Sequence, residues 1–237
     1  MKKLGVLLPS RNRPEGLQRA VESWAKNSTH SDIFFCFQED DPHLKANITI
    51  AGNKPYHIVG DIGLAAKANM LCDSHPGYSG YMVLNDDQII HTSGWDRMIL
   101  DRLDKLEAES GHRLWIPHWR DGIHDEKLCQ GFSTREMLAA TGSHLPRGYM
   151  RHLFTDNYFM FIGKTCGLLH YMPEIFIEHL HFVVGKAPVD QNYQRSNSVD
   201  AYQRDETAFK RWLKERGALT LSCIQSQISQ GEAMAQS

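Results

Sequence analysis

Short, unbroken apolar runs that alternate with helical patterns dominate the first half of this sequence. Residues 4–8, 33–37 and 81–84 are apolar almost throughout, which is typical of short strands buried on both faces of a sheet. Apolar side chains recur at helical spacing in residues 14–24 and 64–71. Strands that alternate with helices form mostly parallel sheets with helices on both faces. We therefore expect an α/β fold with a Rossmann-like, mostly parallel sheet flanked by helices.

The length of the chain, 237 residues, suits a single domain of this kind. We expect the domain to span residues 1–225 and a polar, frayed C-terminal tail to occupy residues 226–237. No apolar run approaches the roughly 18 residues of a membrane span, and the run that follows Met1 is too short for a signal peptide. These features predict a cytoplasmic protein with no membrane partner, and they leave the oligomeric state open.

Composition and missing motifs exclude several classes of protein. The formal net charge of −2 argues against a globally basic nucleic-acid coat and still allows a local basic groove. The five cysteines form no CxxC pair, which argues against a zinc ribbon. A dinucleotide-dependent oxidoreductase and a P-loop phosphotransferase are disfavoured because neither GxGxxG nor GxxxxGK[ST] occurs. A sugar-phosphate nucleotidyltransferase is disfavoured because residues 9–14 contain no glycine.

Two adjacent carboxylates, Asp86 and Asp87, follow the strand expected at residues 81–84. In a parallel α/β sheet, ligands bind outside the carboxyl ends of the strands. Carboxylate oxygens suit Mg²⁺ or Mn²⁺, which often share their coordination shell with phosphates. The alternative is a solvated Asp-Asp turn, so the pair by itself leaves both interpretations open.

Two later segments contribute further candidate residues. His179 and His181 point to the same face if this segment is extended, and they can join a carboxylate around a metal ion; the alternative is one core histidine and one surface histidine. Asp156 stands near the start of an expected helix, where it is either an N-cap or a general base.

Taken in chain order, these clusters resemble the GT-A glycosyltransferases, in particular the family 2 type and its small phage-like relatives. The resemblance spans about residues 4–195, and it implies a GT-A type, mixed but mostly parallel sheet. The segments that carry it are residues 6–14, 63–69, 84–90 with 94–96, 155–157, and 178–181 with 185–186.

The resemblance implies a nucleotide-sugar donor, most often a UDP-sugar, and a Mn²⁺ or Mg²⁺ ion held by Asp87 and His181. Asp156 would take the proton from the acceptor hydroxyl, which gives inversion; a retaining reaction follows if Asp156 lies on the other side of the sugar. Asn85 departs from the first aspartate of the family's DxD pattern, which lowers the negative charge of the implied metal site. The residues implied to contact the nucleotide are Pro9, Arg11, Asp40, Lys67, Asp86 and Lys186.

The acceptor is the least constrained part of the prediction. The resemblance to phage enzymes favours a hydroxymethylated pyrimidine in DNA, with Arg147 and Arg151 binding phosphates and Trp119 stacking on a base. The alternatives are a glycan, protein or small-molecule acceptor, or a non-catalytic module that binds nucleotide-sugars or nucleic acid. These two arginines would be solvated and the tryptophan would lie in the core if they served structure alone.

Overall fold

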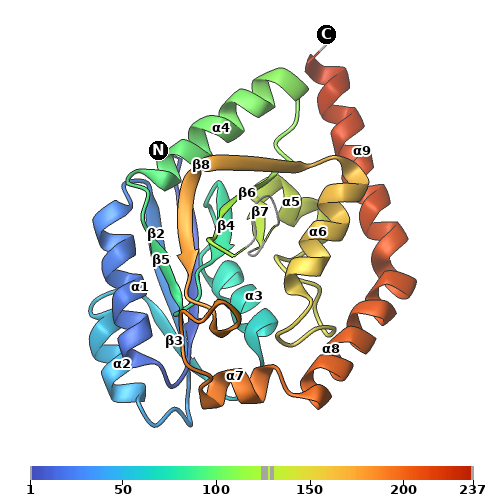
Figure 1. The fold of residues 1–237 in the computed structure, drawn as a ribbon. Helices are drawn as coiled ribbons and strands as arrows, with labels where there is room; N and C mark the ends of the chain where they lie inside the picture. The colour runs from blue at the N-terminus through green and yellow to red at the C-terminus, as the bar shows by residue number, and fades with distance from the viewer. Residues whose placement is uncertain (1, 124–127, 129–130, 236–237) are drawn as a thin grey trace.

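A five-stranded sheet forms the centre of the molecule in the computed structural model, which describes residues 2–123, 128 and 131–235 (Figure 1). Four of its strands are parallel, and the last runs antiparallel to its neighbour at one edge. The predicted mixed, mostly parallel α/β sheet is therefore confirmed. In spatial order the strands are β3 (Tyr56–Val59), β2 (Ser31–Gln38), β1 (Leu4–Ser10), β4 (Gly80–Val83) and β7 (Phe132–Thr134).

A second, three-stranded sheet brings a late part of the chain to the carboxyl edge of the first. Its central strand, β8 (Leu169–His179), pairs antiparallel with β5 (Gln88–Ile90) and parallel with β6 (Ile116–Arg120). The strand bends sharply after it passes beneath α4 (Trp95–Ser110), as Figure 1 shows. Its C-terminal end pairs with the start of β5, so the histidines that follow lie beside the loop after β4.

The central sheet separates two hydrophobic cores, and β1 supplies side chains to both. Val6 and Leu8 pack with α1 (Pro14–Asn27) and α4, whereas Leu7 packs on the other side. The second core also contains α3 (Leu64–Ser74) and side chains of α6 (Thr155–Cys166). Alternate burial on two faces explains why β1 is apolar without interruption. The remaining helices of this body are α2 (Leu44–Ala51) and α5 (Arg135–Thr141).

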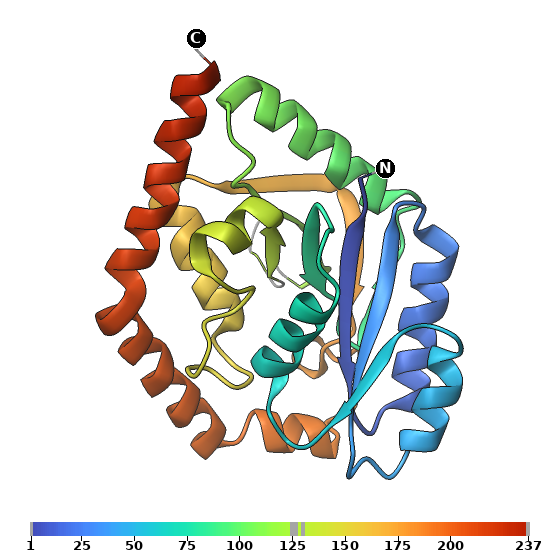
Figure 2. The same ribbon diagram turned by 180° about the vertical axis from the view of Figure 1, so that it is seen from behind.

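The C-terminal helices run along one edge of the molecule (Figure 2). They comprise α7 (Gln191–Ser196), α8 (Val199–Trp212), a π-helical turn (Leu213–Gly217), and α9 (Ala218–Ala235). The frayed tail predicted from residue 226 is therefore wrong as far as residue 235, and residues 236 and 237 lie outside the described chain. Polar neighbours conceal the helical spacing of Ile224, Ile228 and Gly231, of which Ile224 is fully buried.

Local details of the second half differ from the sequence-based expectations. The side chain that caps α5 is Thr134, whose hydroxyl accepts a hydrogen bond from the Met137 amide at 3.1 Å. The segment of His179 and His181 is extended only in part, because β8 ends at His179 and His181 lies beyond it. Within the described residues, no helix combines the length and apolarity that a membrane crossing requires.

Candidate active site

A cleft of about 510 Å³ opens at the carboxyl ends of β1, β2 and β4. Its lining comes from parts of the chain that are far apart in sequence. They are the loop after β1, the end of β2, the segment from Asp61 to Lys67, the loop after β4, the segment before α6, the end of β8 with His181, and the C-terminal segment of α7 and α8. This is the edge where α/β folds bind ligands. Eight of the predicted site residues line the cleft: Pro9, Arg11, Lys67, Asp86, Asp87, Arg151, Asp156 and His181.

The floor of the cleft holds the two adjacent carboxylates, with one guanidinium between them. Arg13 Nη1 lies 3.1 Å from both Asp86 Oδ1 and Asp87 Oδ2. Ser10 Oγ donates a further hydrogen bond to Asp86 Oδ2 at 2.7 Å. Gly16 allows α1 to approach this loop, because a Cβ atom there would lie 2.5 Å from the Asp86 carbonyl oxygen. The close packing of α1 therefore places Arg13, just before the helix, beside the carboxylates.

The C-terminal segment closes over the same guanidinium. Asp190 accepts two hydrogen bonds from Arg13, at 2.6 and 3.0 Å. Tyr193 places its ring 4.3 Å from the guanidinium carbon of Arg13 and donates its hydroxyl hydrogen to Asp87 Oδ2 at 2.6 Å. Arg13 thus connects the loop after β4 to α7 through three carboxylates and one aromatic ring.

The two central carboxylates have different affinities for protons. Burial and the charge of Asp87 raise the pKa of Asp86 above the ordinary aspartate range, against the opposing charge of Arg13. The pKa of Asp87 is lowered although burial opposes the shift, because His179 and Tyr193 stabilise its charged form. Asp86 therefore takes up a proton at higher pH than Asp87 does.

The donor set around Asp87 fits a divalent cation. Asp87 Oδ1 is buried and has no hydrogen-bond partner, and His179 Nε2 lies 3.4 Å from it. The rings of His179 and His181 lie 5.0 Å apart. One carboxylate with one or two imidazoles suits Mn²⁺. Among the described residues no group of three such side chains is already placed to hold a metal ion.

Buried polar groups line the side of the cleft next to β2 and α3. Lys67 Nζ lies 3.2 Å from Gln38 Oε1, and burial lowers the pKa of this lysine. Gln38 Nε2 is buried without a hydrogen-bond partner. A buried ammonium group and an unsatisfied amide beside an open cleft are suited to a polar ligand, since such groups are otherwise costly to bury.

The segment that leads into α6 forms a further part of the cleft lining. The carboxylate of Asp205, on α8, accepts backbone N–H hydrogen bonds from Arg151, His152 and Leu153 at 3.3, 2.8 and 2.8 Å. Asp205 is fully buried. Asp156 follows in the first turn of α6, where the helix dipole favours its charged form. A residue on α8 therefore fixes the loop that presents Asp156 to the cleft.

Four of the predicted site residues do not line the cleft. Asp40 lies at the surface in an ion pair with Arg11 at 3.3 Å. Lys186 pairs with Glu178 at 2.7 Å, and Arg147 pairs with Asp73 at 2.7 Å.

Trp119 differs most from its predicted role. It is 4% exposed and packs against Trp95, with their ring centroids 6.4 Å apart. It is therefore a core residue, and the prediction that it stacks on an acceptor base is wrong.

The structure also reveals site residues that the sequence analysis did not single out. Arg13 lies in the loop after β1 and Gln38 ends β2, but nothing in their local pattern distinguishes them from solvated neighbours. Asp190, Tyr193 and Asp205 come from the C-terminal helices, which carry no family-like motif. Their contacts with residues more than 50 positions away exist only in the folded chain.

Known proteins resemble this chain in structure and not in sequence. The sequence matches no protein-family model and no curated protein. The structure is similar to mannosyltransferase PcManGT from Pyrobaculum calidifontis in complex with GDP-Man and Mn²⁺, with a TM-score of 0.58 and 11% identity over 98% of this chain and 75% of that one. The chain has a GT-A fold.

Two further solved structures share this GT-A fold. S. aureus TarS 1–349 in complex with UDP gives a TM-score of 0.55 and 9% identity over 90% of this chain and 75% of that one. Glucosyl-3-phosphoglycerate synthase from Mycobacterium tuberculosis in complex with Mg²⁺ and UDP gives a TM-score of 0.53 and 10% identity over 86% of this chain and 80% of that one. The resemblance inferred from the sequence is thereby confirmed at the level of the fold.

Proposed function

We propose that this protein is a glycosyltransferase that moves a sugar from a nucleotide-sugar to an acceptor hydroxyl. The observation that carries the proposal is the meeting of three groups in one cleft: the carboxylate and imidazoles around Asp87, the buried polar pair of Lys67 and Gln38, and the carboxylate of Asp156. The similar GT-A structures that hold UDP with Mg²⁺, or GDP-Man with Mn²⁺, support a donor of this class.

In this proposal the donor is a UDP-sugar whose nucleotide lies along Pro9, Arg11 and Lys67. Asp87, with His179 and His181, would hold Mn²⁺ or Mg²⁺. Such an ion neutralises the charge that develops on a leaving diphosphate. Lys67 is a cation within the cleft, so it is placed to balance phosphate charge beside it.

Asp156 is proposed as the general base. It lines the cleft in the first turn of α6. From there it would accept the proton of the acceptor hydroxyl while the hydroxyl oxygen attacks the anomeric carbon and the bond to the diphosphate breaks. Attack from the face opposite the leaving group gives inversion of configuration.

We further propose that the acceptor is a hydroxymethylated pyrimidine in DNA. Its support is the set of arginines at the mouth of the cleft, Arg151, Arg195 and Arg204, because guanidinium groups bind phosphates well. A base must also leave the duplex stack to reach a cleft of this size.

The test is sugar transfer from radiolabelled UDP-glucose and UDP-N-acetylglucosamine to an oligonucleotide that contains 5-hydroxymethylcytosine. We expect Asp156→Asn to reduce transfer by at least about 100-fold, as for loss of a general base, with unchanged UDP affinity. Asp200→Asn, an exposed position on α8, is the matched control. Full transfer by the Asp156→Asn variant would exclude this residue as the base.

A further inference from the structure

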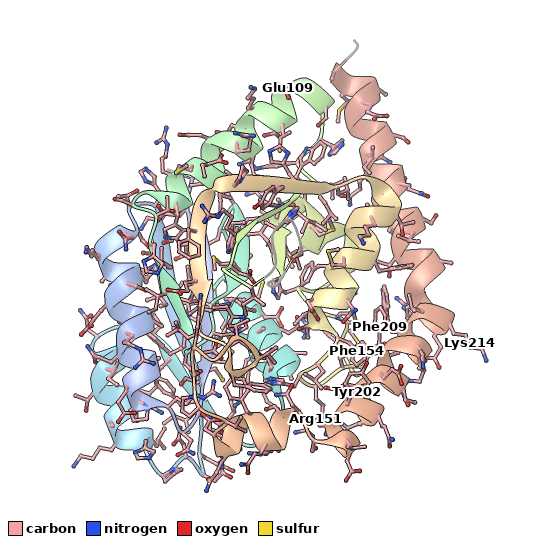
Figure 3. All side chains as sticks on the ribbon, viewed as in Figure 1. Glu109, Arg151, Phe154, Tyr202, Phe209 and Lys214 are labelled. Carbon is pink, nitrogen blue, oxygen red and sulfur yellow. The ribbon has the colours of Figure 1, made fainter. Side chains whose placement is uncertain are left out.

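Three aromatic side chains pack together beside the cleft and form an aromatic wall: Phe154, just before α6, and Tyr202 and Phe209 on α8. Phe154 lines the cleft. The ring of Tyr202 meets the ring of Phe154 edge to face, with their centroids 5.1 Å apart. The ring of Phe209 stacks on that of Phe154, with their centroids 5.9 Å apart. Figure 3 labels all three between α6 and α8, with Arg151 close by. Tyr202 is 51% exposed although its ring packs against Phe154.

The backbone holds Phe154 in this wall at a conformational cost. Its φ angle is 65°, in the left-handed region that side chains larger than asparagine rarely adopt. The preceding residues are fixed by Asp205, and Arg151 O accepts a hydrogen bond from the Ala65 amide at 3.0 Å. Strained conformations of this kind concentrate at ligand sites.

Two arginines beside the wall share a single carboxylate. Arg151 and Arg195 pair with Asp61 at 3.0 and 2.6 Å, so this group carries one excess positive charge. Arg204 follows Tyr202 by two residues on α8 and bonds Asp205 at 2.9 Å, while the same carboxylate also accepts the three backbone N–H groups. The wall therefore combines exposed ring surface with cations that retain donor capacity.

We propose that Phe154 and Tyr202 form the stacking wall of the acceptor subsite and that this subsite takes a nucleobase whose phosphates lie toward Arg151 and Arg204. A flat base offers a face to the exposed ring, and guanidinium groups beside an aromatic surface are the usual means of holding a single nucleic-acid strand. The inference rests on the proposed function and assigns its acceptor side to residues of α8 and the loop before α6.

The experiment measures binding of a fluorescein-labelled, single-stranded 12-mer with one central 5-hydroxymethylcytosine by fluorescence anisotropy. Tyr202→Ala is expected to raise Kd on the order of tenfold, the loss typical of one stacked base, and Tyr202→Phe to leave it within about twofold. Tyr56→Ala, a 41% exposed tyrosine on β3, is the matched control and should bind as the wild type does. A 12-mer with an abasic site at the central position should bind the wild type about as weakly as the intact strand binds Tyr202→Ala.

Equal Kd values for wild type and Tyr202→Ala, or for intact and abasic strands, would overturn the proposal. Binding of maltohexaose in preference to the strand would overturn it as well, in favour of a glycan acceptor. Calorimetry with UDP on the same samples separates the two claims. If no protein binds UDP, wild type included, the glycosyltransferase proposal is contradicted. If UDP binds but Tyr202→Ala leaves the Kd of the strand unchanged, only the stacking wall is contradicted.

Discussion

At the scale of single residues, the central feature is one arginine that balances three carboxylates. Arg13 contacts Asp86, Asp87 and Asp190 within 3.1 Å, and burial of its side chain makes these contacts strong. Despite burial, which acts in the opposite direction, hydrogen bonding to Asp190 and the neighbouring negative charges raise the pKa of Arg13. The cluster still holds more negative than positive charge, which leaves room for an added cation.

Removal of this arginine should destabilise the fold and make the stability of the variant depend on a divalent metal ion. We expect Arg13→Ala to lower the free energy of unfolding by about 3 kcal/mol, because it leaves buried carboxylates without a counter-ion. Millimolar Mn²⁺ should recover a larger part of the stability of this variant than it adds to the wild type. Urea unfolding with and without Mn²⁺ checks this.

Arg135→Ala is the control for that measurement, since Arg135 forms an exposed ion pair with Glu136, and such pairs contribute little. An Arg13→Ala variant as stable as the control would show that Arg13 does not balance the carboxylate cluster.

The site residues that the sequence predicts best are those that follow expected strands. Asp86, Asp87 and His181 follow strands and stand in recognisable spacing, and all three line the cleft. Trp119 was assigned by residue type alone, and an aromatic residue near a site is more often core than ligand contact. Arg13 was missed because its role depends on Asp190, which lies 177 positions later.

At the scale of elements, α8 supports the acceptor side of the cleft. Its buried Asp205 ties down residues 151–153 through three backbone N–H groups. An asparagine in its place has only one acceptor oxygen, so at least one of these N–H groups would lose its partner. The loop that carries Phe154 and Asp156 should then become less well fixed.

Asp205→Asn is therefore expected to reduce kcat about tenfold and leave the Kd of UDP unchanged, because misplacing a base affects the chemical step more than donor binding. Steady-state kinetics and UDP calorimetry on the same protein check this split. An equal loss in kcat and in UDP affinity would indicate general unfolding of the site, contrary to the positioning role.

The same carboxylate predicts a pH dependence of stability. The pKa of Asp205 is lowered because hydrogen bonds from Arg204 and the loop amides outweigh the effect of burial. Its contribution to stability is thus present above the ordinary aspartate pKa of about 3.9 and is lost as pH falls through the lower folded value. The stability difference between wild type and Asp205→Asn should be constant above about pH 5 and shrink below pH 4. Urea unfolding from pH 3 to pH 7 checks this, and a gap that widens in acid would contradict it.

At the scale of the whole molecule, the sequence predicts the first half of the fold better than the second. Continuous apolar runs such as residues 4–8 and 33–37 identify β1 and β2 without ambiguity. The course of β8 and the helix α9 were not predicted, because their burial depends on packing against segments distant in sequence. Gly231 of α9 illustrates this, since a Cβ atom there would lie 2.4 Å from the Gly111 carbonyl oxygen.

The central claim is that the cleft holds a nucleotide-sugar with a divalent ion beside Asp87. Calorimetry with UDP in the presence and absence of Mn²⁺ tests it most directly. We expect the wild type to bind UDP at least about tenfold more tightly with Mn²⁺, and Asp87→Asn to lose that enhancement, because Asp87 would help to hold an ion that neutralises diphosphate charge. Asp101→Asn, an exposed position on α4, should behave as the wild type does. UDP binding that is absent, or that is unaffected by Mn²⁺ and by Asp87→Asn, would contradict the account.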